Sequence, residues 1–155
     1  MNLAVALDGI LRAPTGAVIP EGRYLIEALR PMGRLVFMCD TTEDDARRWL
    51  HQNRVPNEEI LGTAVDLGRG EPLRHRQINV LRALGPMRYV VDPDPSVVAW
   101  ALSEGITSLL FAHPVFALPK NRPDIESPKR KWADIENEYV RQLTPLPKES
   151  EDAGF

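Results

Sequence analysis

The feature that most constrains the fold is an apolar run at the start of the chain, which stops abruptly at Asp8 and Gly9. An uninterrupted apolar run is typical of a strand buried on both faces, as in the middle of a parallel sheet. We therefore expect residues 2–8 to form a central strand. Asp8 then falls at the carboxyl end of that strand, the edge of an open α/β sheet where ligands and catalytic groups gather.

Strand and helix patterns alternate along the rest of the chain. Further strands are expected at residues 34–39, 60–65, 88–91 and 107–111, with helices beginning at Pro20, after Thr41 or Thr42, at Leu73 and at Pro95. In the helix of residues 73–84, the side expected to be buried carries Leu73, Gln77, Val80, Leu81 and Leu84. The alternation predicts an α/β protein, a three-layer Rossmann-like fold with about five parallel strands and right-handed crossovers.

The composition of the chain changes after the last expected strand, where prolines become frequent. We divide it into an α/β core at 1–112, a proline-rich arm at 113–128, a C-terminal helix at 129–143 and a tail at 144–155, expected to be disordered. The C-terminal helix carries an apolar stripe of Trp132, Ile135, Tyr139 and Leu143. That stripe packs either on the protein's own sheet or, reached by the arm, on a second copy in a homodimer or on another protein.

Composition and charge narrow the class of protein. Of the 155 residues, 43% are hydrophobic and 26% are charged, which is ordinary for a soluble globular domain. A net charge of −3 gives no general attraction to nucleic acid or to a membrane surface, and no apolar run approaches the roughly 20 residues that span a bilayer. Cys39 is the single cysteine, which favours a reducing, cytoplasmic compartment.

Acidic turns follow three of the expected strands, with Asp8, Asp40, and the pair Asp92 and Asp94. A parallel sheet would bring these turns together at one edge. Clustered carboxylates repel one another unless a cation or a hydrogen-bond donor satisfies them, and Mg²⁺, which prefers oxygen ligands, would do so. Alternatively the acids cap helices. We favour capping for Asp40 and Asp94, and a site for Asp8 and Asp92.

Two stretches resemble the haloacid dehalogenase (HAD) superfamily of phosphatases: Ala-Leu-Asp-Gly-Ile-Leu at 6–11 and Val-Val-Asp-Pro-Asp-Pro at 90–95. The resemblance spans roughly residues 2–112 and looks closest to small capless HAD-like proteins encoded by bacteriophages, which would place this one in the host cytoplasm. It implies a Rossmann-like sheet and an aspartate that attacks a phosphoryl group. It also implies a second aspartate two residues later as acid/base, and Mg²⁺ to neutralise the phosphate.

The first motif of that family, Asp-x-Asp-Gly, fits this chain in two registers. Matching Gly9 places Asp8 on the second aspartate and Ala6, which cannot form an acyl-phosphate, at the nucleophile position. The other register makes Asp8 the nucleophile and places Ile10 at the acid/base position. We prefer the first register because it keeps the glycine match.

Other motif positions also depart from the family. Cys39 stands where the family has Ser or Thr, Arg74 or Arg76 is the nearest cation to its lysine, and Ser96 replaces the usual acid after Asp92. The expected site residues are therefore Asp8 as the catalytic group, Cys39, Asp40, Arg74 and Arg76 as substrate-binding groups, and Asp8 with Asp92 as metal ligands.

Three functions remain open at this point. The first is a HAD-like protein with a degenerate site and weak or absent phosphohydrolase activity, which still binds a small phosphorylated ligand or Mg²⁺. The second is a non-catalytic interaction protein on the same scaffold, assembled through the C-terminal arm and helix. The third is an active Mg²⁺-dependent phosphatase on a small substrate such as a nucleotide, with Asp8 as nucleophile.

Overall fold

The computed structural model describes residues 1–56, 59–65, 70–113, 137 and 141. Apart from residue 113 and two single positions, the expected arm, C-terminal helix and tail lie outside the described residues. The apolar stripe of the C-terminal helix lies outside them as well, so its packing and its part in any assembly stay predictions.

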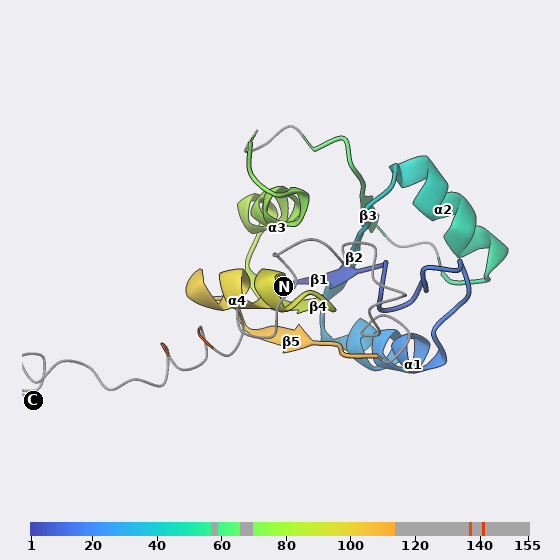
Figure 1. Cartoon of the computed structure of the whole chain (residues 1–155), viewed down its shortest axis with the longest axis horizontal. Helices are drawn as coiled ribbons and strands as arrows, with labels where there is room; N and C mark the ends of the chain where they lie inside the picture. The colour runs from blue at the N-terminus through green and yellow to red at the C-terminus, as the bar shows by residue number, and fades with distance from the viewer. Residues whose placement is uncertain (57–58, 66–69, 114–136, 138–140, 142–155) are drawn as a thin grey trace, which may run out of the picture.

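Five parallel strands form one sheet in the described part of the chain (Figure 1). The strands are β1 (Asn2–Ala6), β2 (Arg34–Met38), β3 (Glu59–Leu61), β4 (Met87–Asp92) and β5 (Ser108–Leu110), in the order β3-β2-β1-β4-β5. Every neighbouring pair is parallel. This confirms the predicted α/β class and Rossmann-like sheet, although β3 is shorter than expected and stops at Leu61.

Helices cover both faces of the sheet. In Figure 1, α1 (Pro20–Leu29) and α2 (Glu43–Gln52) lie on one side, and α3 (Leu73–Leu84) and α4 (Pro95–Ser103) lie on the other. The chain moves outward from β1 first to β2 and β3 and later to β4 and β5, and a constant crossover hand then puts the two helix pairs on opposite faces. None of the described helices is both long enough and apolar enough to traverse a bilayer.

Alternating side chains divide the core into two parts. Leu3 and Val5 of β1 pack in a cluster with residues of α1 and α2, whereas Ala4 packs with residues of α3 and α4. In β2, Phe37 belongs to the first cluster and Val36 to the second. Both faces of the central strands are therefore buried, which is the physical reason for their uninterrupted apolar runs.

Local capping signals start two of the helices. The Thr42 hydroxyl accepts a hydrogen bond from the Asp45 backbone N–H at 3.2 Å and caps α2. Asp94 accepts one from the Ser96 backbone N–H at 2.9 Å and caps α4, as predicted. The capping role favoured for Asp40 is wrong, because Thr42 occupies the cap position of the helix that follows.

The helix α3 has the predicted bounds, and its buried face agrees with the prediction in part: Gln77 and Leu81 are buried as expected. Its buried residues are Arg74, Gln77, Ile78 and Leu81, whereas Leu84 is 62% exposed. The helix turns Arg74 inward because that guanidinium meets carboxylates at the carboxyl edge of the sheet. A pattern that counts only apolar residues cannot find such a face.

Candidate functional site at the carboxyl edge of the sheet

The acid-bearing turns meet at the carboxyl edge, as the sequence predicts. One Asp8 oxygen, Oδ2, accepts the Asp40 backbone N–H at 3.0 Å. Arg74 joins the other two turns, because its Nη2 lies 2.7 Å from Asp40 Oδ1 and its Nε lies 2.9 Å from Asp92 Oδ2. These groups flank β1 and β4, where the strand order reverses, which is the common ligand position in open α/β sheets.

Arg12 is the counter-ion of Asp8 and Asp45. Its Nε lies 2.6 Å from Asp8 Oδ1 and its Nη1 lies 3.1 Å from Asp45 Oδ2, while its Nη2 donates to the Thr41 hydroxyl at 3.1 Å. Burial lowers the pKa of Arg12, but hydrogen bonds and charge from Asp8 and then Asp45 outweigh it and raise that pKa. The guanidinium therefore stays charged while its side chain is only 9% exposed.

Arg74 is the counter-ion of Asp40 and Asp92. Its side chain is 7% exposed, and its Nη1 donates to Gln77 Oε1 at 2.7 Å. Burial lowers the pKa of Arg74, and the charges of Asp92 and then Asp40 raise it above the usual value. The Gln77 amide nitrogen lies 3.0 Å from each of three backbone carbonyl oxygens, those of Cys39, Leu61 and Gly62. This network ties α3 to the ends of β2 and β3.

The loop that carries Arg12 is held from two sides. A Cβ on Gly22 of α1 would fall 1.7 Å from the Ile10 carbonyl oxygen, so only glycine permits the helix to lie this close to the loop. On the other side, the Trp49 indole N–H donates to the Gly16 carbonyl oxygen at 2.8 Å. The Trp49 ring also lies 5.7 Å from the Arg12 guanidinium, within cation–π range.

A hollow of about 230 Å³ opens at this edge. Its lining residues are Asp8, Gly9, Arg12, Ala13, Pro14, Asp40 and Thr41. Asp8 reaches the hollow, whereas Ala6 is fully buried in the core cluster beneath α1 and α2. Of the two residues that the alternative registers place at the nucleophile position, Asp8 is therefore the one with access to a ligand.

Two other predicted site residues have different surroundings. The Cys39 thiol is buried and donates to the carbonyl oxygens of Thr41 and Leu61, each at 3.4 Å, and burial raises its pKa, so it stays a neutral thiol. Arg76 donates to the carbonyl oxygens of Val65 and Glu71. Of the two arginines that were alternatives for the cation at the edge, the structure brings Arg74 there.

The sequence reasoning missed Arg12, Asp45 and Gln77 as parts of this site. One signal could have found Arg12, because it lies four residues after Asp8, a spacing at which opposite charges often pair. Gln77 was expected on the buried side of its helix, and a buried amide needs hydrogen-bond partners. Asp45 carries no local signal for its pairing, since its partner lies 33 residues away.

The oxygens expected to hold Mg²⁺ are engaged by other groups. Asp8 is bound by Arg12 and by a backbone N–H, and Asp92 accepts the Asp94 N–H at 2.8 Å and faces Arg74. A divalent ion at these oxygens would stand against a buried guanidinium of the same sign. In the described ranges no three His, Cys, Asp or Glu side chains are grouped as a metal site. This arrangement does not fit the Mg²⁺ that the resemblance implies.

Comparison with known proteins adds no relative: no protein-family model, curated protein or solved structure matches this chain. The likeness to the HAD superfamily therefore rests on the residues quoted above. The sheet order is compatible with it, but that order is common to many Rossmann-like proteins.

Proposed function

We propose that this chain is a HAD-like protein with a degenerate phosphatase site and weak or absent phosphohydrolase activity. The observation that carries the proposal is the engagement of Asp8, whose two oxygens bind the Arg12 guanidinium and the Asp40 backbone N–H. A nucleophilic carboxylate must direct a lone pair at phosphorus. Charge-assisted hydrogen bonds stabilise the resting carboxylate and hold its lone pairs elsewhere.

The arrangement of charges at the edge also disfavours phosphate binding, because the carboxylates are more exposed than the guanidiniums. The side chains of Asp8, Asp40 and Asp45 are 22%, 41% and 48% exposed, whereas those of Arg12 and Arg74 are almost buried. An approaching phosphate would meet carboxylates before it met a guanidinium, and like charges at short range repel. We therefore propose that the ion pairs hold the loops of the edge together, and that ligand binding uses another surface.

An activity assay tests this proposal. The purified chain is offered p-nitrophenyl phosphate and nucleoside monophosphates with Mg²⁺, beside the variants Asp8→Asn and Asp44→Asn. We expect the same background rate from all three proteins, because no catalytic carboxylate is available to lose. Turnover that Asp8→Asn abolishes and Asp44→Asn retains would overturn the proposal in favour of an active phosphatase.

A thermal-shift experiment tests separately whether the carboxyl edge binds Mg²⁺ or phosphate. Mg²⁺ and inorganic phosphate are added one at a time, and the Tm of the chain is compared with that of Asp8→Asn. We expect neither addition to raise the Tm, since a ligand stabilises a protein only by binding its folded state. A rise in Tm with Mg²⁺ that disappears in Asp8→Asn would show that Asp8 binds the metal, and would contradict the proposal that Arg12 and the Asp40 N–H occupy its oxygens.

A further inference from the structure

The strands β4 and β5 present an apolar surface on the side of the sheet that carries α1 and α2. The helix α4 packs on both strands from the other side (Figure 1). Tyr89 and Phe111 are only partly buried against the core cluster beneath α1 and α2. Leu109 lies two residues before Phe111, so it points to the same side, and it is 39% exposed. We call Tyr89, Leu109 and Phe111 the β5 face. Parallel sheets are almost always covered on both sides, so this face calls for a covering element.

The chain leaves β5 on the side of the β5 face. His113 Nε2 lies 3.1 Å from Glu21 Oε2 in the first turn of α1. Figure 1 shows the chain running from β5 to α1. Leu25 lies one turn after Glu21 on the same side of α1 and is partly buried against the core cluster. The residues that follow His113 therefore start beside an apolar surface to which both α1 and β5 contribute.

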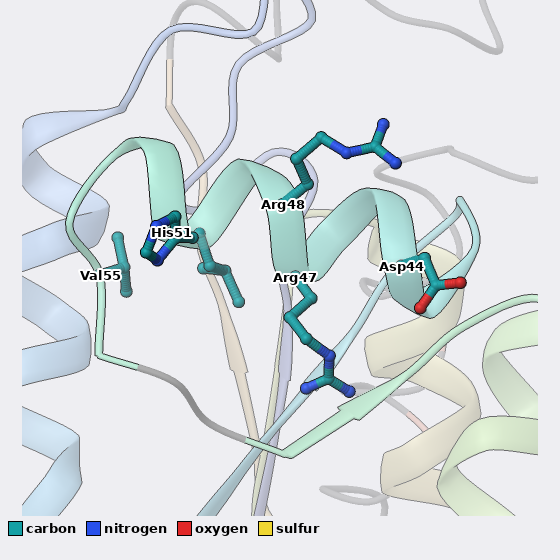
Figure 2. A pocket seen from close by; sticks show the side chains of 6 residues that line it. Asp44, Arg47, Arg48, His51 and Val55 are labelled. Carbon is teal, nitrogen blue, oxygen red and sulfur yellow. The ribbon is translucent and has the colours of Figure 1, made fainter.

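A hollow of about 570 Å³ along α2 offers an apolar partner much less. Charged side chains line it, among them Arg47 and Arg48, which Figure 2 shows pointing in opposite directions. Its apolar lining comes from Leu50 and Val55, which are 1% and 8% exposed. Because these two side chains are already buried, covering them would remove little further apolar area from water.

The expected C-terminal helix supplies a matching apolar surface. Two of its positions are described, and both Asn137 and Arg141 are helical and exposed. They lie four residues apart and so share one side of the helix. The expected apolar stripe falls on the opposite side of the same helix and consists of Trp132, Ile135, Tyr139 and Leu143. The side that remains for packing is therefore the one with the stripe.

We propose that residues 129–143 form a helix that covers the β5 face of their own chain, with the apolar stripe against Leu109. Residues 114–128 can extend to about 50 Å, which greatly exceeds the length of about 10 Å of a three-residue strand such as β5. The arm therefore lets the helix reach this face. A tethered helix also has a high effective concentration, whereas a second copy must lose its free translation to bind. The proposal involves no phosphate chemistry, so it goes beyond the proposed function.

A spin label at residue 137 tests where this helix lies. Asn137→Cys is labelled in the ¹⁵N-labelled full chain, and the buried Cys39 does not compete for the reagent. The loss of each amide signal is measured against the same sample with the label reduced. We expect the strongest losses at residues 21–28 and 108–111, and weaker ones at 59–61 on the far edge of the sheet. Losses centred on residues 44–55 would place the helix at the α2 hollow and overturn the proposal.

Variants of the helix test whether the stripe makes the contact. In Ile135→Ser/Tyr139→Ser the signal loss at residues 108–111 should at least halve, because half of the stripe is removed. The matched control Asp134→Ser/Glu138→Ser has the same spacing on the other side of the helix and should keep the full loss. A loss that is unchanged in Ile135→Ser/Tyr139→Ser would show that the stripe does not hold the helix there.

Variants of the sheet test the other half of the contact. Leu109→Ser should reduce the signal loss at residues 21–28 and 108–111, because it removes the most exposed apolar side chain of the β5 face. Leu84→Ser is the control, since Leu84 is 62% exposed at the end of α3 on the other side of the sheet. If the two variants behave alike, Leu109 has no part in holding the helix and the proposal fails.

A mixed sample distinguishes the chain's own helix from that of a second copy. The ¹⁵N-labelled chain without a spin label is mixed with an equal amount of unlabelled chain that carries the label at residue 137. We expect the signals of residues 108–111 to keep their full intensity. A loss at these residues in the mixture would mean that the helix of one copy covers the β5 face of another, and would overturn the proposal in favour of a dimer.

Discussion

The arginines of the carboxyl edge and those of α2 have opposite surroundings. Arg12 and Arg74 are 9% and 7% exposed, and each has two carboxylates within 3.1 Å. Arg47 is 47% exposed, and its carboxylate partner Glu43 is 3.9 Å away. One side-chain type therefore has two roles in this protein, and hydration decides between them.

The physical reason is the cost of removing a charge from water. A buried guanidinium has lost its hydration and is tolerated only while carboxylates and carbonyls satisfy it, so Arg12 and Arg74 act as fixed counter-ions. An exposed guanidinium such as that of Arg47 keeps its water, so the pairs that it makes contribute little to stability. Four measurements test whether burial separates these arginines.

The largest effect is expected for Arg74→Ala. Removing this guanidinium leaves Asp92 buried without its counter-ion, so the free energy of unfolding should fall by about 3–5 kcal/mol. Urea denaturation followed by circular dichroism measures the loss. The control is Arg76→Ala on the same helix, which loses hydrogen bonds to two carbonyls and should cost about 1 kcal/mol. Equal losses in the two variants would show that burial beside carboxylates gives Arg74 no greater role in stability than the half-buried Arg76.

The next effect is the coupling between Arg74 and Asp92. In a double-mutant cycle with Arg74→Met and Asp92→Leu, the double variant should lose about 1–3 kcal/mol less than the sum of the single losses. The exposed pair Arg82 and Glu104, 2.8 Å apart, gives the matched cycle with Arg82→Met and Glu104→Leu. Its coupling should stay below about 1 kcal/mol. A larger coupling at the exposed pair would contradict the ranking by burial.

A smaller effect is expected on the acid side of the stability profile. Hydrogen bonds from Thr41 and then Arg12 lower the pKa of Asp45 from its ordinary value of 3.8. Because the folded pKa is the lower one, the stabilisation is present above pH 3.8 and is lost as the pH falls through the folded value. Asp45→Asn should therefore flatten the loss of stability below about pH 4, by less than about 1 kcal/mol for so exposed a group. Urea midpoints measured from neutral to acid pH show the change.

The smallest effect is expected for Arg47→Gln/Arg48→Gln. Both side chains face solvent, so the free energy of unfolding should change by no more than about 0.5 kcal/mol. Thermal and urea unfolding of the variant measure this. A loss near that of Arg74→Ala would mean that these arginines stabilise the fold, and the comparison between the two regions would fail.

Much of the fold could be predicted because its signals are local. Pro20 begins α1, Asp94 caps α4, and α3 runs from Leu73 to Leu84 as expected. The boundaries of β3 were less predictable, because a three-residue strand at the edge of a sheet is defined by its pairing with β2 and not by its own pattern.

The site could be predicted in its position more than in its chemistry. Asp8, Asp40 and Asp92 converge because each lies at or just after the carboxyl end of a strand of one parallel sheet, and strand order alone brings these ends together. The side chains that pair with these acids could not be predicted in the same way. Arg12 meets Asp45 across 33 residues and Arg74 meets Asp40 across 34, so these pairs exist only once the strands are side by side.

Apolar periodicity and helix caps act over a few residues, so the amino-acid sequence is enough to predict the alternation of strands and helices and the edge at which the acids gather. The inward position of Arg74, the outward position of Leu84 and the pairing of the acids with guanidiniums depend on the folded arrangement of the whole chain. The reason is that a buried charge needs a partner within about 4 Å, and such distances between remote residues arise only when the chain is folded.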